Sequence, residues 1–336
     1  MILEQLMEQY NNDREGQGLP PHEPLQVFDL IGGTSTGGII AIMLGRLRMR
    51  IADCREAYES LAAEAFKPLN YAFRPVHRLR DKFNAAPEFD VHALEGAIRK
   101  VLAKYGAEGH PDGGLLKDTV LQACKVFVVC TNQRNTETEL LRSYKNPKKA
   151  QSWYDECRIL EACRATSAAT TYFPAVQIQG DTYIDGGLLS NNPVQHVHAE
   201  AMDLWPAHEQ FIISIGTGES PHTAFKGNLK VLAEDLARIA TETHRTAETF
   251  RAHDGHRMST AGLYYRFNVP GLGRIGLEEW AESPQVRALT RNYVNSSDAY
   301  EPRGRCVRRM METSEGNTVL VSSILRSQLK STEDFS

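Results

Sequence analysis

The 336-residue chain lacks several features that would assign it to a broad class at once. It has no apolar run of about 18 residues, so we expect no transmembrane helix. Lys and Arg number 38 against 42 Asp and Glu, and the net charge of −4 argues against a general affinity for nucleic acid. None of the six cysteines forms a Cys-x-x-Cys pair, so we expect reduced thiols and no zinc site.

The first ten residues, MILEQLMEQY, carry early acidic side chains and no apolar signal core. We therefore expect no secretory signal there, and we expect a cytoplasmic protein. The hydrophobic share of 41% and the charged share of 24% are those of an ordinary globular protein.

Strands of the buried type alternate with helices along the chain, and this predicts an α/β fold with a mostly parallel sheet covered by helices on both faces. The predicted strands are 26–31, 125–131, 139–144, two within 173–185, 211–215 and 263–269. The predicted helices are 1–10, 39–47, 51–66, 91–105, 155–165, 193–204, 229–250 and 317–328.

No composition break requires a second domain, and no internal repeat or low-complexity block is visible. We predict a catalytic unit over residues 1–220. Residues 221–336 are expected to form a helical C-terminal part, packed on the same domain and ending in a short polar tail.

A candidate nucleophile lies where the apolar run VFDLI (27–31) meets a glycine-rich turn that precedes a predicted helix. Its residues, which fit G-x-S-x-G, are Gly33, Thr34, Ser35, Thr36 and Gly37. A serine on a sharp strand-to-helix turn adopts strained backbone angles that expose its hydroxyl, and the flanking glycines let strand and helix pass closely.

Two simpler interpretations of this turn remain open. A Gly-rich turn after a strand can cradle phosphate, although residues 32–38 lack the Lys-Ser/Thr ending of a P-loop and do not fit G-x-G-x-x-G. The same turn can also be purely structural. The strand before it and the helix after it favour the nucleophile elbow.

A serine nucleophile needs a base, and histidine is the usual one. The histidines considered downstream are His196, His198, His222 and His244. His196 and His198 fall inside one predicted helix, two residues apart, so they point in different directions. All four are more simply read as surface or structural histidines.

Asp185 is a stronger candidate base, because it ends a predicted strand and is followed by Gly186 and Gly187. Such positions at strand ends are where open α/β sheets gather their active sites. The alternative is an ordinary Asp-Gly turn, which the residues alone would favour.

Taken together, these segments resemble the patatin-like phospholipase family. Four segments agree in the right order, over about residues 3–218. They are the elbow (33–37), ATSAATTYFP (165–174), DGGLLSNNP (185–193), which includes Asp185-Gly186-Gly187, and FIISIGTG (211–218).

The resemblance implies a three-layer α/β/α fold and a lipid acyl hydrolase of the phospholipase A, lysophospholipase or glycerolipid lipase type. Ser35 would attack the ester carbonyl to form an acyl-enzyme, and Asp185 would accept and return the proton. No metal or other cofactor is expected, and the substrate would be a phospholipid or another glycerolipid.

Family members also carry an Asp-Gly-Gly-Gly-x-[Arg/Lys]-Gly loop whose backbone N–H groups form the oxyanion hole. No such loop lies upstream of Ser35, which leaves the backbone N–H of Thr36 as one donor. Losing one donor costs roughly 100- to 1,000-fold in rate. Two explanations follow: a truncated active enzyme, which we favour, or a catalytically weak lipid-binding or regulatory protein on the same fold.

Residues 74–82 are rich in basic side chains and lie near Tyr71, Phe73 and Phe83. Such a segment can contact a lipid surface, so we consider peripheral membrane binding. The simpler interpretation is a solvated surface loop.

Overall fold

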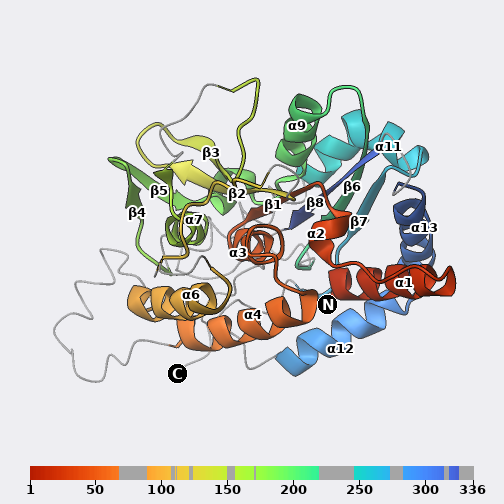
Figure 1. Cartoon of the computed structure of the whole chain (residues 1–336), viewed down its shortest axis with the longest axis horizontal. Coiled ribbons are helices and arrows are strands. Elements are labelled where there is room, and N and C mark those ends of the chain that lie inside the picture. Colours follow the sequence, from red (N-terminus) through yellow and green to blue (C-terminus); the bar gives the residue numbers. More distant parts are fainter. Residues whose placement is uncertain are drawn as a thin grey trace, which may run out of the picture.

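The computed structural model describes residues 1–67, 89–106, 110, 112–120, 124–149, 156–169, 172–218, 246–272, 283–313 and 318–324. These residues form an eight-stranded sheet between two layers of helices. In Figure 1, α9 and α11 lie on one side of the sheet, and α1, α4, α6 and α12 lie on the other. The predicted three-layer α/β/α class is therefore confirmed.

Helices and strands alternate through much of the described chain. The strands are β1 (Leu30–Thr34), β2 (Lys125–Asn132), β3 (Glu137–Arg142), β4 (Val176–Ile178), β5 (Asp181–Asp185), β6 (Glu209–Ile215), β7 (Tyr264–Phe267) and β8 (Thr318–Ile324). The helices are α1 (Ile2–Gly16), α2 (Pro24–Val27), α3 (Thr36–Ala41), α4 (Ile51–Ala65), α6 (Val91–Tyr105), α7 (Ile159–Thr166), α8 (Gly187–Ser190), α9 (Val194–Leu204), α11 (His256–Thr260), α12 (Ser283–Val294) and α13 (Ser297–Thr313). Two π-helical turns are η1 (Ile42–Arg46) and η4 (Arg251–Gly255).

The strand order is β4-β5-β2-β1-β8-β6-β7, and β3 also pairs with β2. Strands β2, β1, β8, β6 and β7 run parallel to one another. Parallel strands buried on both faces read as continuous apolar runs, and this explains why β2 and β6 were predicted correctly.

The register along β2 brings β1 and β5 together. Val129 and Cys130 both pair with β3, which therefore occupies one edge of β2. On the other edge, Val129 pairs with Thr34, the last residue of β1, and Cys130 pairs with Asp185, the last residue of β5. Strands β1 and β5 thus follow one another along the same edge, with their last residues opposite adjacent positions of β2.

The predicted strand 26–31 is placed too early in the chain. Residues Pro24–Val27 form the short helix α2, and strand β1 begins only at Leu30 and includes both glycines of LIGGT. Proline at the first helical position and the capping box between Glu23 and Gln26 favour a helical turn at this point.

The predicted helix 317–328 is wrong over the residues that the structure describes. Thr318–Ile324 form β8, which lies between β1 and β6 and pairs with both in parallel. All but the first of its residues are buried. A β-branched, apolar segment enclosed on both edges gains two hydrogen-bonded ladders, which a helix in this place would forgo.

Other predictions have mixed outcomes. Helix 91–105 and the hairpin of β2 and β3 are confirmed, whereas the first helix runs past residue 10 to Gly16. Most of the predicted helix 229–250 lies outside the described residues. The division at residue 220 stays a prediction, and β7 and β8 show that the C-terminal part also completes the sheet.

Among the helices that the structure describes, none combines the length and apolar character needed to span a bilayer.

Candidate active site

Ser35 occupies a strained turn between the end of β1 and the start of α3. Its φ of 58° and ψ of −130° are unfavourable for a residue with a side chain. A Cβ on Gly33 would lie 2.2 Å from the carbonyl oxygen of Gly37, so only glycine fits at the first position of the motif. The strand-turn-helix geometry predicted for the elbow is present.

Ser35 and Asp185 lie in direct contact. The Ser35 hydroxyl donates a hydrogen bond to Asp185 Oδ2 at 2.6 Å. The other carboxylate oxygen, Oδ1, accepts from the backbone N–H of Gly187 at 2.7 Å. Both residues are buried, with Ser35 2% and Asp185 3% exposed. The contact follows from the β2 register and places a carboxylate where it can take the proton of the serine hydroxyl.

The Asp-Gly-Gly segment helps to orient the carboxylate. Gly186 and Gly187 lead directly from β5 into the short helix α8, and the N–H of Gly187 fixes the second oxygen of Asp185. Thr34 links the end of β1 to the end of α8, because its hydroxyl donates a hydrogen bond to the carbonyl oxygen of Ser190 at 2.9 Å.

The two described histidines of α9 have partners other than Ser35. His196 Nε2 lies 3.0 Å from Ser190 Oγ, and burial lowers the pKa of His196. His198 Nδ1 lies 2.6 Å from Gln210 Oε1. Neither imidazole is the partner of the Ser35 hydroxyl, and His222 and His244 lie outside the described residues.

Thr166 contacts the elbow and was not singled out from the sequence. Its hydroxyl oxygen accepts a hydrogen bond from the backbone N–H of Ser35 at 2.8 Å. The same hydroxyl donates to the carbonyl oxygen of Val129, also at 2.8 Å. Thr166 belonged to the family-like segment ATSAATTYFP, but only the fold shows what its hydroxyl contacts.

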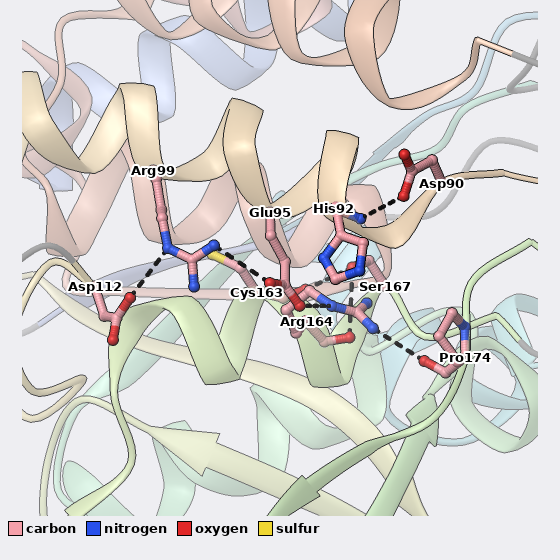
Figure 2. A network of polar contacts seen from close by, with 9 residues as sticks. All are labelled: Asp90, His92, Glu95, Arg99, Asp112, Cys163, Arg164, Ser167 and Pro174. Carbon is pink, nitrogen blue, oxygen red and sulfur yellow. Dashed lines mark hydrogen bonds and ion pairs between the residues drawn. The ribbon is translucent and has the colours of Figure 1, made fainter.

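Helix α7, which ends at Thr166, is held against α6 by the polar network of Figure 2. Arg164 donates to Glu95 at 3.3 Å and to the carbonyl oxygen of Pro174 at 3.0 Å. Arg99 bridges Glu95 and Asp112, each at 3.3 Å. The α7 segment that contacts Ser35 is therefore also anchored on its outer side.

The backbone N–H of Thr36 is the donor that lies next to Ser35 in the chain. Helix α3 starts at Thr36, so the N–H of Thr36 belongs to the first helical turn after Ser35. The residues described upstream of β1 form α1, α2 and their connection, without a glycine-rich donor loop. Residues 68–88, with the basic segment 74–82, lie outside the described part.

Other reactive groups are placed differently. Over the described residues, no cluster of three or more His, Cys, Asp or Glu side chains is arranged to hold a metal ion. All six cysteines are buried and free, and burial raises the pKa of Cys54 and Cys163 to about 12. Thiols with such a pKa are poor nucleophiles at neutral pH.

The chain was compared with known proteins. A family model described as patatin-like phospholipase matches residues 13–198. The calcium-independent phospholipase A2-gamma of Rattus norvegicus is 28% identical over 276 residues, which are 76% of this chain and 32% of that protein. Phospholipase A I of Arabidopsis thaliana is 27% identical over 322 residues, covering 81% of this chain and 24% of its own length.

A bacterial relative is also similar. The cGAMP-activated phospholipase of Vibrio cholerae is 31% identical over 184 residues, which are 53% of this chain and 47% of that protein. The chain thus spans about a third or less of the first two relatives, and about half of the third.

Proposed function

Because the chain belongs to the patatin-like phospholipase family, we propose that it hydrolyses carboxylic esters of glycerolipids, with Ser35 as nucleophile and Asp185 as base. The observation that carries this proposal is the 2.6 Å hydrogen bond from the Ser35 hydroxyl to Asp185 Oδ2. Phospholipids are the first substrate class to consider, since the similar proteins above are named phospholipases.

The chemistry needs only these two side chains for proton transfer. Ser35 Oγ attacks the ester carbonyl carbon while Asp185 Oδ2 accepts the hydroxyl proton. Asp185 then gives this proton to the leaving alcohol, and the acyl group remains on Ser35. Water attacks the acyl ester, loses a proton to Asp185, and releases the fatty acid as Ser35 regains its hydroxyl.

The negative charge on the carbonyl oxygen needs donors in the transition state. We assign one of them to the backbone N–H of Thr36, which follows the nucleophile and opens α3. Covalent reaction of the serine reports directly on the dyad, so it is a better first readout than lipid hydrolysis.

The test is covalent labelling by a fluorophosphonate, read by intact mass and peptide mapping. We expect one label on the parent chain, no label on Ser35→Ala, and a rate at least about 100-fold lower for Asp185→Asn. Ser190→Ala serves as the matched control, because Ser190 is the serine that contacts an imidazole. This control should label like the parent.

A folded parent chain that takes no label would contradict the proposal for this chain. The second candidate function would then apply: a lipid-binding or regulatory protein that keeps the fold without turnover. Vesicle co-sedimentation of the same preparation distinguishes it, since such a protein binds lipid without reacting. A label on Ser190 in place of Ser35 would also reject the dyad.

We further propose that the reaction needs no calcium. The carboxylate of Asp185 is engaged by the Ser35 hydroxyl and the N–H of Gly187, which leaves the proton-transfer step independent of a cation. Labelling rates should be equal with EDTA and with millimolar calcium. A loss of labelling in EDTA that calcium restores would contradict this part of the proposal.

A further inference from the structure

Two residues of the segment 166–168, Thr166 and Ala168, contact the backbone of the two members of the dyad. The Thr166 hydroxyl accepts from the N–H of Ser35, and the carbonyl oxygen of Ala168 accepts from the N–H of Asp185 at 2.9 Å. Thr166 is the last residue of α7, and Ala168 lies two residues beyond it. The serine and the aspartate are 150 positions apart in the chain, yet one short segment holds the main chain of each.

The Thr166 hydroxyl is a donor to one partner and an acceptor from the other. Its proton goes to the carbonyl oxygen of Val129, so its oxygen is left to accept from Ser35. Val129 is the residue of β2 that pairs with Thr34, the neighbour of Ser35. The hydroxyl therefore links the strained residue to the strand on which the register of the dyad is set.

The space around this hydroxyl is closed. A Cβ on Gly38 would lie 2.7 Å from Thr166 Oγ1 and 2.8 Å from its Cγ2. Thr166 has no exposed surface, so water cannot replace the hydroxyl as the partner of the Ser35 amide. Only a side chain of similar size with an acceptor oxygen meets both demands.

We propose that Thr166 is a positioning residue, which holds the strained backbone of Ser35 so that its hydroxyl stays within reach of Asp185. This inference rests on the proposed function for its effect on rate, whereas the hydrogen bond itself can be tested without any activity. A buried N–H that loses its partner is costly, and the elbow relieves that cost by relaxing. A displacement of about 1 Å at a reacting group lowers rates by roughly 100-fold.

The experiment compares three buried substitutions. Thr166→Val keeps the shape and removes the acceptor, whereas Thr166→Ser keeps the acceptor. The matched control is Thr131→Val, because Thr131 is also buried on the sheet and its hydroxyl has no hydrogen-bond partner among the described residues. Each variant is assayed for fluorophosphonate inactivation, which gives the maximal rate and the probe affinity separately, and for amide hydrogen exchange resolved at Ser35.

For Thr166→Val we expect the maximal inactivation rate to fall roughly 10- to 100-fold with little change in probe affinity, and the Ser35 amide to exchange faster. Thr166→Ser and Thr131→Val should behave like the parent in both readouts. Equal rates for Thr166→Val and Thr131→Val would overturn the inference.

Failure of the proposed function looks different. If the parent takes no label, the hydrogen-exchange comparison still decides the role of Thr166. An unchanged exchange rate of the Ser35 amide in Thr166→Val would then reject it.

Discussion

The two edges of β1 are built differently. On the edge toward β2, buried polar groups have partners: Ser35 with Asp185, and Thr166 with the carbonyl oxygen of Val129. On the edge toward β8, the hydroxyls of Ser322 and Ser323 are buried and have no hydrogen-bond partner among the described residues. We call these the β2 flank and the β8 flank.

The difference shows that the described residues organise the half of the site that contains Ser35 and Asp185. The β2 flank positions Ser35 and Asp185 through specific side-chain hydrogen bonds. The β8 flank supports β1 through its backbone ladder and packing. Substitutions that remove these hydrogen bonds on the β2 flank should therefore be costly, whereas substitutions of the unpartnered hydroxyls on the β8 flank should be nearly neutral.

The largest effect on stability should come from Glu200 of α9. Its carboxylate accepts two hydrogen bonds from Arg142 of β3, at 2.7 and 2.8 Å, and further bonds from Tyr144 and Asn146. Because Glu200→Ala leaves the guanidinium of Arg142 buried without its counter-charge, we expect a loss of about 3–5 kcal/mol in urea unfolding. Glu64→Ala, which breaks an exposed pair with Lys100, should cost at most about 1 kcal/mol. Equal losses of stability in Glu200→Ala and Glu64→Ala would mean that the pair of Glu200 and Arg142 stabilises the fold no more than an exposed pair does.

Gly33→Ala should follow in magnitude. The new methyl group would meet the carbonyl of Gly37, so we expect a destabilisation of about 1–3 kcal/mol and loss of fluorophosphonate labelling. Gly16→Ala is the matched control, since nothing lies within 4 Å of its added Cβ. An alanine at 33 that keeps the labelling rate of the parent would show that the elbow tolerates a wider turn.

Acid should weaken the contact between α9 and β3 through Glu200. Burial acts to raise the pKa of this carboxyl, but the hydrogen bonds and charge of Arg142, with Tyr144 and Asn146, hold it below its ordinary value of 4.5. A lowered pKa means that the stabilisation is present above pH 4.5 and is lost as the pH falls through the pKa of the folded state. In urea titrations, the stability gap between the parent and Glu200→Gln should narrow below pH 4.5. A gap that stays constant down to pH 3 would exclude this linkage.

The smallest effect is expected on the β8 flank. Ser323→Ala removes a buried hydroxyl that has no partner among the described residues, so stability should stay the same or rise by up to about 1 kcal/mol. The labelling rate should not change. A clear loss of stability would show that this hydroxyl is engaged, and the contrast between the flanks would then be weaker than described.

Local patterns in the sequence singled out the two residues that meet on the β2 flank. The G-x-S-x-G turn after a buried strand led to Ser35, and a strand ending in Asp-Gly-Gly led to Asp185. Their contact depends on the register of β1 and β5 along β2, which no local pattern records. Thr166 was missed for the same reason, because its hydroxyl acts on residues that are far away in the chain.

The β8 flank was predicted poorly. Residues 318–324 were assigned to a helix, since a short apolar run is compatible with either a buried strand or a buried helix. Their partners are Leu30–Gly33 on one side and β6 on the other. Only pairing across almost the whole chain makes this segment a strand.

The central place of β8 has a consequence for biosynthesis. Strand β1 leaves the ribosome well before β8, and one edge of β1 stays open until residues 318–324 arrive nearly 300 residues later. Such long-range pairing gives a high contact order and slow folding. The strand that leads into Ser35 is thus synthesised long before it is enclosed on both edges, and during that interval it is an exposed template for aggregation that chaperones would have to shield.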